Sequence, residues 1–539
     1  MRFARRLSGL TKLLCAASLV ALAGCATQPA TPTPAATATP AKKLPVIDLD
    51  EKKAFPLDKH LESKDIAAGS MTNAQLFEAG AKLFHTPYNG LDGVGMKHTV
   101  GGAPVGRFSV GPAGGGQPIP VGAQSCGSCH AMPFATAAGL AHARVFFDAD
   151  QDGKPPFAPR DATSVFGNGL LQLLAQEMTE QLLASRDAAA SQAKAKPGTA
   201  VKQELEANGV DFGVVSATAN AKGEVAFDVS QVRGVSPDLV VRPLGWKGNV
   251  PTLRVFSVAA GTFGMGMMGE EFVWRVADKL GDDPDGDGVT REFSVGDITA
   301  MTVYMAGQET PTPIAHLAEL GLVAAPDAAT TARINAGRDL FTKIGCTSCH
   351  VPEMRLKSTI FEEPTPAGGG NYFDKFLASK DPDYDPKRPV KFDLAKEAEV
   401  PRVETVAGGG ALVRLYGDLK RHDMGRTLAE PVPTAPFVTE LGPLMWDGKP
   451  ALIGPSIFLT AELWGVGNTG PYLHDDRAGT LAEAIDMHGE DSPPPVGRPG
   501  RSEAQESRDA YIKLSSEEKN AVISFLKSLV TFADDSANK

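Results

Sequence analysis

Two short strings, CGSCH at residues 126–130 and CTSCH at residues 346–350, constrain this chain more than any other feature. Each has two cysteines three positions apart and a histidine directly after them, which is the signature of covalent attachment of c-type haem. The spacing lets both thiols add to the vinyl groups of one porphyrin, and the adjoining imidazole becomes an axial ligand of the iron. A zinc or redox C-x-x-C is the alternative for a single string, but two copies with the histidine in place favour haem. We therefore predict two covalently bound haems c, held by Cys126, Cys129 and His130 and by Cys346, Cys349 and His350.

The first 25 residues, MRFARRLSGLTKLLCAASLVALAGC, have the composition of an export signal. Basic residues precede an apolar run from Leu13 to Ala23 that is short for a membrane span. LAGC resembles a bacterial lipoprotein box, which would make Cys25 the lipidated first residue; an ordinary signal cleaved nearby is the alternative. We expect residues 1–24 to be a signal peptide that is removed. The exported protein is then lipid-anchored at the periplasmic face, and Ala26 after the cysteine indicates the outer membrane.

This leader completes the account of the six cysteines. Cys15 leaves with the signal and Cys25 carries lipid, so the other four are available for haem and no disulfide is expected. Residues 26–45, ATQPATPTPAATATPAKKLP, lack the apolar content to pack and are typical of a semi-rigid spacer. We place a lipidated tether and N-terminal extension at residues 25–69.

The composition agrees with a globular body behind this tether. A net charge of −11 argues against nucleic acid as a partner. Of the 539 residues, 42% are hydrophobic, which is enough for substantial cores. Membrane contact is therefore expected through the lipid anchor only.

An internal repeat divides the remaining chain. EAGAKLF (Glu78 to Phe84) and NAGRDLF (Asn335 to Phe341) share A-G-x-x-L-F, and each predicts an amphipathic helix leading to a haem-binding string. A glycine-rich insert intervenes in the first copy, and only TKIG in the second. We predict a mainly α fold of two tandem cytochrome c-like haem domains, residues 70–330 and 331–539, with long loop-rich insertions. A capped helix is expected near the end, at residues 514–529.

Several longer strings resemble bacterial di-haem cytochrome c peroxidases and MauG-like enzymes. ELWGVGNTGPYLHDDRAGTLAEAIDMHGE (residues 462–490) is similar to a segment of those enzymes, and LGWKGNVPTLRVF, GNGLLQLL and LKRHDMG are similar to related di-haem oxidoreductases described as thiol-oxidoreductase-like. The resemblance extends from about residue 70 to the end. It implies a peroxidase-like oxidoreductase that reduces peroxide or oxidises a substrate at the first haem, with electrons relayed by the second.

The resemblance also implies a ligand for the second haem. In these families the distal ligand follows the histidine of the PYxHDG string by fourteen residues, which here leads from His474 to His488. Ligation by His350 and His488 would give a closed, low-spin site of lower potential than a His/Met pair. Met424 in HDMG and Met487 are rivals, and a helix-capping role for His488 is the other alternative.

The first haem is expected to be the reactive one, because peroxide needs an open iron position and a nearby acid or base. The resemblance gives Trp246 the place of the residue between the haems and offers Glu270 and Glu271 as the distal acid. From the residues alone, a core tryptophan and two acids on a solvated turn are equally open.

Two departures from the family leave the function class open. The Ala/Gln/Lys-rich interval before Trp246 is longer than in compact peroxidases, and Gln172 stands where relatives often have Glu. A non-catalytic periplasmic electron-transfer cytochrome and a di-haem oxygenase of the rubber-cleaving type are the alternatives. The expected partners are a small-molecule oxidant or organic substrate and a periplasmic electron donor, either a small cytochrome or a cupredoxin.

Two acidic strings resemble the first half of a calcium loop. DPDGDG (residues 283–288) and DADQDG (residues 148–153) have carboxylates at alternating positions before glycine. Neither has Glu at the twelfth position, where Ser294 and Pro159 stand. We take Asp283, Asp285 and Asp287 as candidate calcium ligands and DADQDG as a solvated turn.

Overall fold

The structure is a computed structural model. It describes residues 57, 59–96, 123–131, 133, 145–147, 158–277, 282–365, 373–396, 401–431, 435–439, 442–491 and 500–533. The chain divides into a unit of residues Met1–Asp50 and a unit of residues Glu51–Lys539, and every described residue belongs to the second. Cys25, the predicted signal peptide and the DADQDG string lie outside the described residues.

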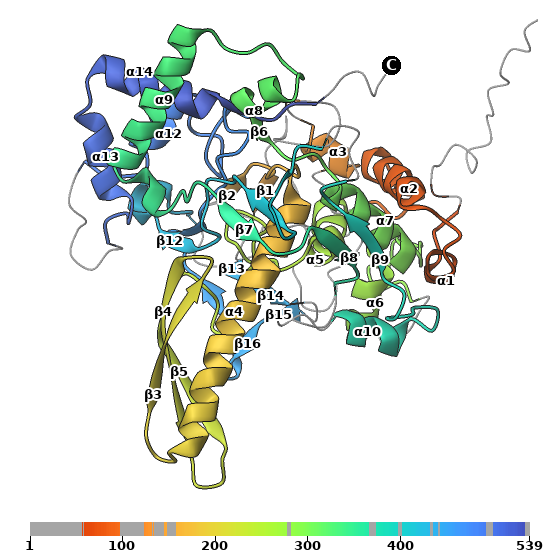
Figure 1. The fold of residues 1–539 in the computed structure, drawn as a ribbon. Coiled ribbons are helices and arrows are strands. Elements are labelled where there is room, and N and C mark those ends of the chain that lie inside the picture. Colours follow the sequence, from red (N-terminus) through yellow and green to blue (C-terminus); the bar gives the residue numbers. More distant parts are fainter. Residues whose placement is uncertain are drawn as a thin grey trace, which may run out of the picture. The chain divides into compact units, whose positions relative to one another are not determined.

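Helices alternate with short strands along the described chain (Figure 1). The α-helices are α1 Ser63–Ala67, α2 Asn73–His85, α3 Cys126–Cys129, α4 Asn168–Ala195, α5 Leu253–Ala260, α6 Glu270–Val276, α7 Val295–Ala306, α8 Ile314–Glu319, α9 Ala328–Lys343, α10 Phe373–Lys380, α11 Gly425–Leu428, α12 Leu481–Asp486, α13 Gln505–Ile512 and α14 Ser516–Lys527. A π-helical turn, η2 Gly261–Met265, and a 3₁₀ turn, η3 Cys346–Ser348, complete the helical segments of the described residues.

The strands pair antiparallel in small sheets, β3-β4-β5 and β7-β11-β10 with three strands each and the pairs β1-β2, β6-β20, β8-β9, β12-β19, β13-β18, β14-β15 and β16-β17. Their bounds are β1 Val145–Phe147, β2 Ala158–Arg160, β3 Val201–Ala207, β4 Val210–Ala219, β5 Val225–Val232, β6 Thr312–Pro313, β7 Met354–Leu356, β8 Ile360–Glu363, β9 Val390–Asp393, β10 Glu404–Thr405, β11 Ala411–Val413, β12 Arg421–Asp423, β13 Ala435–Pro436, β14 Val438–Thr439, β15 Gly442–Pro443, β16 Met445–Trp446, β17 Lys449–Pro450, β18 Leu452–Ile453, β19 Ile457–Leu459 and β20 Leu529–Val530.

The predicted fold class, mainly α with two tandem cytochrome c-like domains, was wrong. Helices account for 36% of the described residues and strands for 18%, distributed over several sheets. The predicted terminal helix is present as α14, where Ser515 and Glu518 form a capping box.

The largest strand-bearing segment follows α4. β3, β4 and β5 form an antiparallel sheet that packs along α4 (Figure 1). Asn208 and Gly209 make the β3-β4 turn with φ of 48° and 78°, the left-handed conformation that an Asn-Gly hairpin turn requires. Near the far end of α4 the helix and the sheet meet through four fully buried alanines, Ala189, Ala193, Ala217 and Ala219.

The repeated string A-G-x-x-L-F builds the same helix contact twice. α2 meets α7 at Gly80, where an added Cβ would lie 2.0 Å from the carbonyl oxygen of Ala300. α9 meets α14 at Gly337, where an added Cβ would lie 1.9 Å from the carbonyl oxygen of Ala521. Real Cβ atoms do not approach so closely, so glycine is what lets each pair of backbones touch.

An aromatic pair follows each glycine contact. The rings of Phe84 and Tyr304 lie 5.3 Å apart in the first helix pair, and those of Phe341 and Phe525 lie 5.4 Å apart in the second. Tyr304 and Phe525 each stand four positions after the contacted alanine, one helical turn along. The two helix pairs therefore share one packing pattern although most of the surrounding chain differs.

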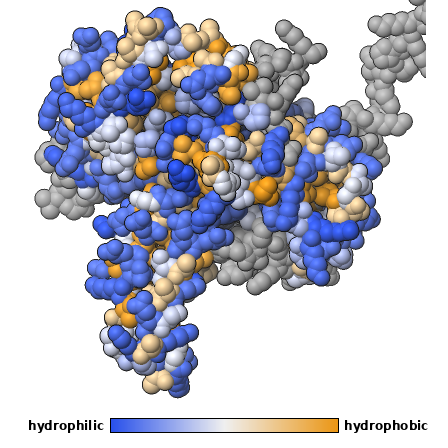
Figure 2. Space-filling view, viewed as in Figure 1, coloured by the Kyte–Doolittle hydropathy of each residue, from blue (hydrophilic) through white to orange (hydrophobic). Residues whose placement is uncertain are grey.

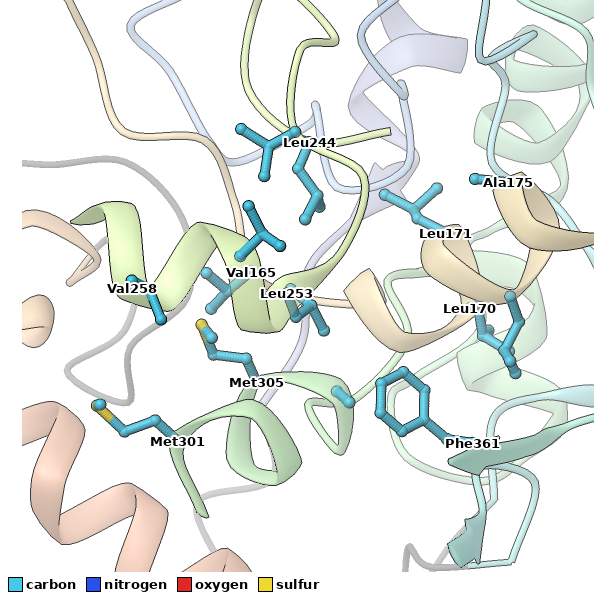
Figure 3. Close-up of a cluster of buried hydrophobic side chains, with 14 of the residues drawn as sticks. Val165, Leu170, Leu171, Ala175, Leu244, Leu253, Val258, Met301, Met305 and Phe361 are labelled. Atoms are coloured by element: carbon cyan, nitrogen blue, oxygen red, sulfur yellow. The ribbon is translucent and has the colours of Figure 1, made fainter. Parts of the chain in front are cut away.

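The main core lies where α4, α5, α7 and β8 meet (Figure 3). It includes these buried side chains: Leu170, Leu171, Leu253, Val258, Met301, Met305 and Phe361. Full burial of a large apolar side chain stabilises a fold by about 1.5–3 kcal/mol, so this cluster holds α7 against α4, α5 and β8.

Hydrophilic side chains predominate on the visible face of α4 and the β3-β4-β5 sheet (Figure 2). None of the helices in the described part of the chain combines the length and apolar character needed to cross a membrane.

The glycine contacts give a stability prediction. Gly337→Ala should destabilise the protein by about 1–3 kcal/mol, because the added methyl group forces α9 away from α14. Gly264→Ala is the matched control, since nothing lies within 4 Å of a Cβ built there. Guanidinium denaturation of both variants measures the effect. Equal midpoints for the two variants would contradict the close helix contact.

Candidate functional site

The two C-x-x-C-H strings adopt the same turn. The N–H of His130 donates to the carbonyl oxygen of Cys126, and that of His350 donates to the carbonyl oxygen of Cys346, each at 3.0 Å. The hydroxyl between the cysteines closes each turn: Ser128 donates to the carbonyl of Ser125 at 2.7 Å, and Ser348 donates to that of Gly345 at 2.8 Å. Both turns direct their two cysteines and their histidine from one short loop.

Each turn lies against the aromatic residue of its own helix pair. The ring of His130 is 5.9 Å from that of Phe84, and the ring of His350 is 6.2 Å from that of Phe341. The repeated A-G-x-x-L-F string thus supplies both the close helix contact and the surface on which the histidine rests.

A cavity of about 300 Å³ opens beside the second turn. This volume is at the lower end of the range of about 300–1,000 Å³ usual for small-molecule and cofactor sites. Its lining contains the predicted site residues Cys346, Cys349, His350, His488 and Trp246. Apolar side chains complete it, among them Leu171, Phe341, Phe458, Leu463, Leu481 and Leu526.

His350 and His488 present the same ring nitrogen to this cavity. The Nδ1–H of His350 donates to the carbonyl oxygen of Tyr416 at 3.1 Å, and the Nδ1–H of His488 donates to that of Ala484 at 2.7 Å. A carbonyl can only accept, so each Nε2 keeps a lone pair for a metal. Burial, with a smaller contribution from His488, lowers the pKa of His350 to about 4, and burial also lowers the pKa of His488. Both imidazoles are therefore neutral, as ligation requires.

The residues around this cavity fit a haem c. The four described cysteines are free thiols, and burial raises the pKa of Cys126 and Cys346 to about 12. Two thiols and two neutral imidazoles at one apolar cavity match the attachment and axial-ligand groups of this cofactor. Met424 lines the same cavity, so the rival ligand from the sequence is also close.

His422, which the sequence analysis passed over, forms an ion cluster beside Cys349. Its Nε2 lies 2.8 Å from a carboxylate oxygen of Asp418, and its Nδ1 lies 2.6 Å from one of Glu503. Burial opposes protonation, but hydrogen bonds to Asp418, Cys349 and Glu503 raise the pKa of His422 to about 11. Since both nitrogens bind carboxylates, His422 has no lone pair left, and a zinc site of Cys349, Asp418 and His422 does not fit.

Asp161 links Trp246 to the loop of His474 through its main chain. The indole N–H of Trp246 donates to the carbonyl oxygen of Asp161 at 2.8 Å, and the N–H of Asp161 donates to the carbonyl oxygen of His474 at 2.8 Å. Trp246 and His474 both line the cavity at the second turn. Burial raises the pKa of the Cys129 thiol at the first turn, and the charge of Asp161 adds to that rise.

His474 and His85 are further histidines at these sites. The buried His474 ring lies 4.5 Å from that of Phe458 and 6.5 Å from that of Trp246, and burial lowers its pKa to about 4. The Nε2 of His85 lies 3.0 Å from the Tyr304 hydroxyl, and its Nδ1 lies 2.6 Å from a Cβ built on Gly127. His85 directly follows the first A-G-x-x-L-F string, which is the signal that could have identified it.

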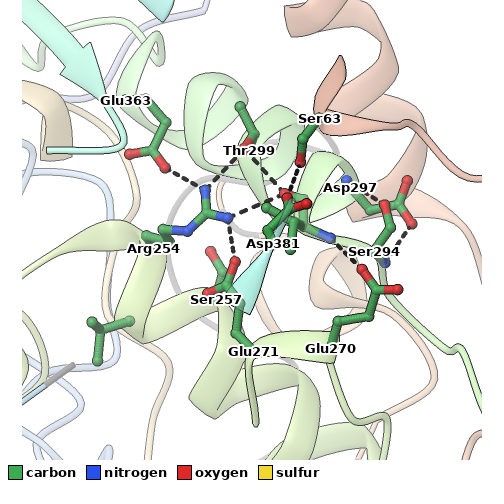
Figure 4. A network of polar contacts seen from close by, with 12 residues as sticks. Ser63, Arg254, Ser257, Glu270, Glu271, Ser294, Asp297, Thr299, Glu363 and Asp381 are labelled. Atoms are coloured by element: carbon green, nitrogen blue, oxygen red, sulfur yellow. Dashed lines mark hydrogen bonds and ion pairs between the residues drawn. The ribbon is translucent and has the colours of Figure 1, made fainter. Parts of the chain in front are cut away.

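Glu270 and Glu271, predicted as distal acids, lie in polar networks on α6 (Figure 4). Glu271 is fully buried and pairs with Arg254, which also binds Glu363 at 2.6 Å, and burial raises the pKa of Glu271. Glu270 binds Arg291 at 2.8 Å and accepts from the N–H of Val295 at 3.1 Å. Neither lines the cavity that contains Trp246, so their catalytic role stays a prediction.

The candidate calcium ligands lie apart from this cavity, in the loop between α6 and α7. Asp283, Asp285 and Asp287 each offer a carboxylate oxygen within 4.8 Å of the others.

Comparison with known proteins gives little to set beside this geometry. No family model and no curated protein matches the chain. A solved structure described as a MauG-like protein associated with microbial copper homeostasis aligns with 58% of this chain and 78% of its own, at 17% identity and a TM-score of 0.28. A likeness at that level carries no inference about fold or chemistry.

The two turns give a prediction about covalent attachment. Intact mass spectrometry should show two haems on the chain, and a Cys346→Ala/Cys349→Ala variant should keep one, because each turn supplies its own pair of thiols. A Ser348→Ala variant is the control, since it leaves both thiols in place. Stoichiometric zinc or a Cys126–Cys129 disulfide would contradict the assignment.

Proposed function

We propose that this protein is a di-haem c-type cytochrome oxidoreductase of the peroxidase-like kind. The observation that carries the proposal is the pair of neutral histidines, His350 and His488, whose Nε2 atoms are free for a metal at one apolar cavity that also holds Cys346 and Cys349. The same C-x-x-C-H turn recurs at Cys126, which supports a second site of the same chemistry.

The second site is built to hold a closed centre. The carbonyls of Tyr416 and Ala484 fix the tautomer and orientation of the two imidazoles, and most of the cavity lining is apolar. The protonated His422 places a positive charge beside Cys349 at the cavity margin. When bound, haem c supplies one-electron redox chemistry, and an iron with an open position also reacts with peroxide or oxygen.

The first site is the proposed reactive one, with His130 as its protein ligand. Trp246 is the proposed residue between the sites: it lines the cavity beside the second turn, and its N–H donates to the backbone carbonyl of Asp161, whose charge adds to the raised pKa of Cys129 at the first turn. An external one-electron donor would complete a peroxide reduction.

Spectroscopy and turnover test the proposed function together. Electron paramagnetic resonance of the resting or half-reduced protein should show one high-spin ferric signal that hydrogen peroxide removes, and peroxide should be consumed when a reduced small cytochrome is supplied. Two low-spin signals that ignore peroxide would identify an electron-transfer protein instead. Consumption of dioxygen with an organic substrate, without peroxide turnover, would identify an oxygenase.

The axial ligand of the second site has its own test. His488→Ala should convert that haem from low spin to a form that binds carbon monoxide, because the only group replaced is the imidazole that faces His350. The spectrum of the first haem should stay nearly unchanged. Met424→Ala, at the same cavity, is the matched control and should leave the second haem low spin. The reverse pattern would assign the ligand to Met424.

A further inference from the structure

The loop between α6 and α7 is shaped by its first acid. The carboxylate of Asp283 accepts from the N–H groups of Gly286 at 2.7 Å, Asp287 at 3.1 Å and Gly288 at 2.9 Å. These bonds curl the DPDGDG string so that Asp283, Asp285 and Asp287 bring their oxygens within 4.8 Å of one another. Gly286 and Gly288 have φ of 71° and 103°, which a side chain would resist.

The loop hydrogen bonds do not explain the burial of Asp285. Its side chain is fully buried at 0% exposure, and no donor among the described residues hydrogen-bonds to either of its carboxylate oxygens. Burying a carboxylate without donors is strongly unfavourable, so such groups are normally paired with a cation or coordinate a metal. The side chain nevertheless lies among two further carboxylates.

A fourth acid, Glu292, approaches the same loop. It is 2% exposed and accepts from the N–H of Met268 at 2.6 Å. Burial first, and then the charges of Asp285, Asp287 and Asp283, raise the pKa of Glu292 to about 11.

The twelfth place of the loop has no glutamate. Ser294 occupies that place and instead caps α7, where its hydroxyl accepts from the N–H of Asp297 at 3.0 Å. The nearby acid Glu292, two residues before Ser294, packs against Gly93. A Cβ built on Gly93 would lie 2.3 Å from the Cγ of Glu292.

We propose that Asp283, Asp285 and Asp287 form a calcium site. Calcium takes six to eight oxygen ligands at about 2.3–2.6 Å in flexible geometry, which three carboxylates, backbone carbonyls and water can supply. Magnesium fits less well, because it demands near-ideal octahedral geometry and usually keeps several waters. The site is separate from the proposed haem chemistry and does not rest on it.

A cation here would act on the first C-x-x-C-H turn through α7. The loop ends where α7 begins, and α7 carries Ala300 and Tyr304, the residues that contact Gly80 and Phe84 of α2. Phe84 in turn lies against His130. Binding therefore secures the helix pair that supports the first turn and has no such connection to α9 and α14.

Calcium binding to the purified full-length protein tests the site. After chelator treatment and dialysis, titration calorimetry with calcium alone should show saturable binding, and Asp285→Asn should abolish one equivalent of it. Asp282→Asn is the matched control, because it removes the same charge one residue before the loop and belongs to no described cluster of ligands. The thermal midpoint of the wild type and of the control should rise with calcium, and that of Asp285→Asn should not.

Three results would overturn the proposal: a wild type that binds no calcium, an Asp285→Asn variant that keeps every equivalent, or a control that loses as much as the variant. The first of these would mean that Asp285 is simply protonated. If Asp285→Asn does not fold, as judged by circular dichroism, Asp287→Asn gives the same comparison. Haem content, read from absorbance, separates this test from the proposed function.

Discussion

The two close helix contacts at glycine are the constraint on which the positions of both C-x-x-C-H turns depend. At Gly80 and Gly337 the helices lie closer than any side chain permits, and the phenylalanine four residues later is held next to that contact. A C-x-x-C-H turn has no internal core of its own, so its histidine takes its position from that phenylalanine. The small sheets and the long α4 pack around these two helix pairs, and their arrangement around one pair is not repeated around the other.

The cavity beside the Cys346 turn shows how burial and backbone carbonyls control two imidazoles. A histidine at an exposed site is partly protonated and free to rotate. Burial lowers the pKa of His350 and His488, and one carbonyl per ring fixes its orientation. The charged His422 only 3.9 Å from Cys349 shows the opposite environment, in which two carboxylates hold the proton in place.

The sequence predicted the parts that depend on local pattern. The C-x-x-C-H turns, the helices with A-G-x-x-L-F and the capped α14 follow from spacing and capping chemistry. The strands after α4 could have been predicted, since the Asn208-Gly209 turn lies between segments in which buried and exposed residues alternate. The Ala/Gln/Lys composition obscured this alternation. The environments of Asp161, His422 and Glu292 were not predictable, because their partners lie far away in the chain and only the fold brings them together. Gln172 belongs to the same class: it accepts from the N–H of Leu253 and donates to Thr365, a pairing that an ionised Glu could not make.

Asp161 binds Trp246 and His474 through its main-chain atoms. Its carbonyl and its N–H hold Trp246 and the loop of His474. The Asp161 side chain is buried, so packing limits which residues can stand there, but these two bonds need no particular side chain. An insertion or deletion beside Asp161 would displace both main-chain groups at once and so shift Trp246 relative to His474.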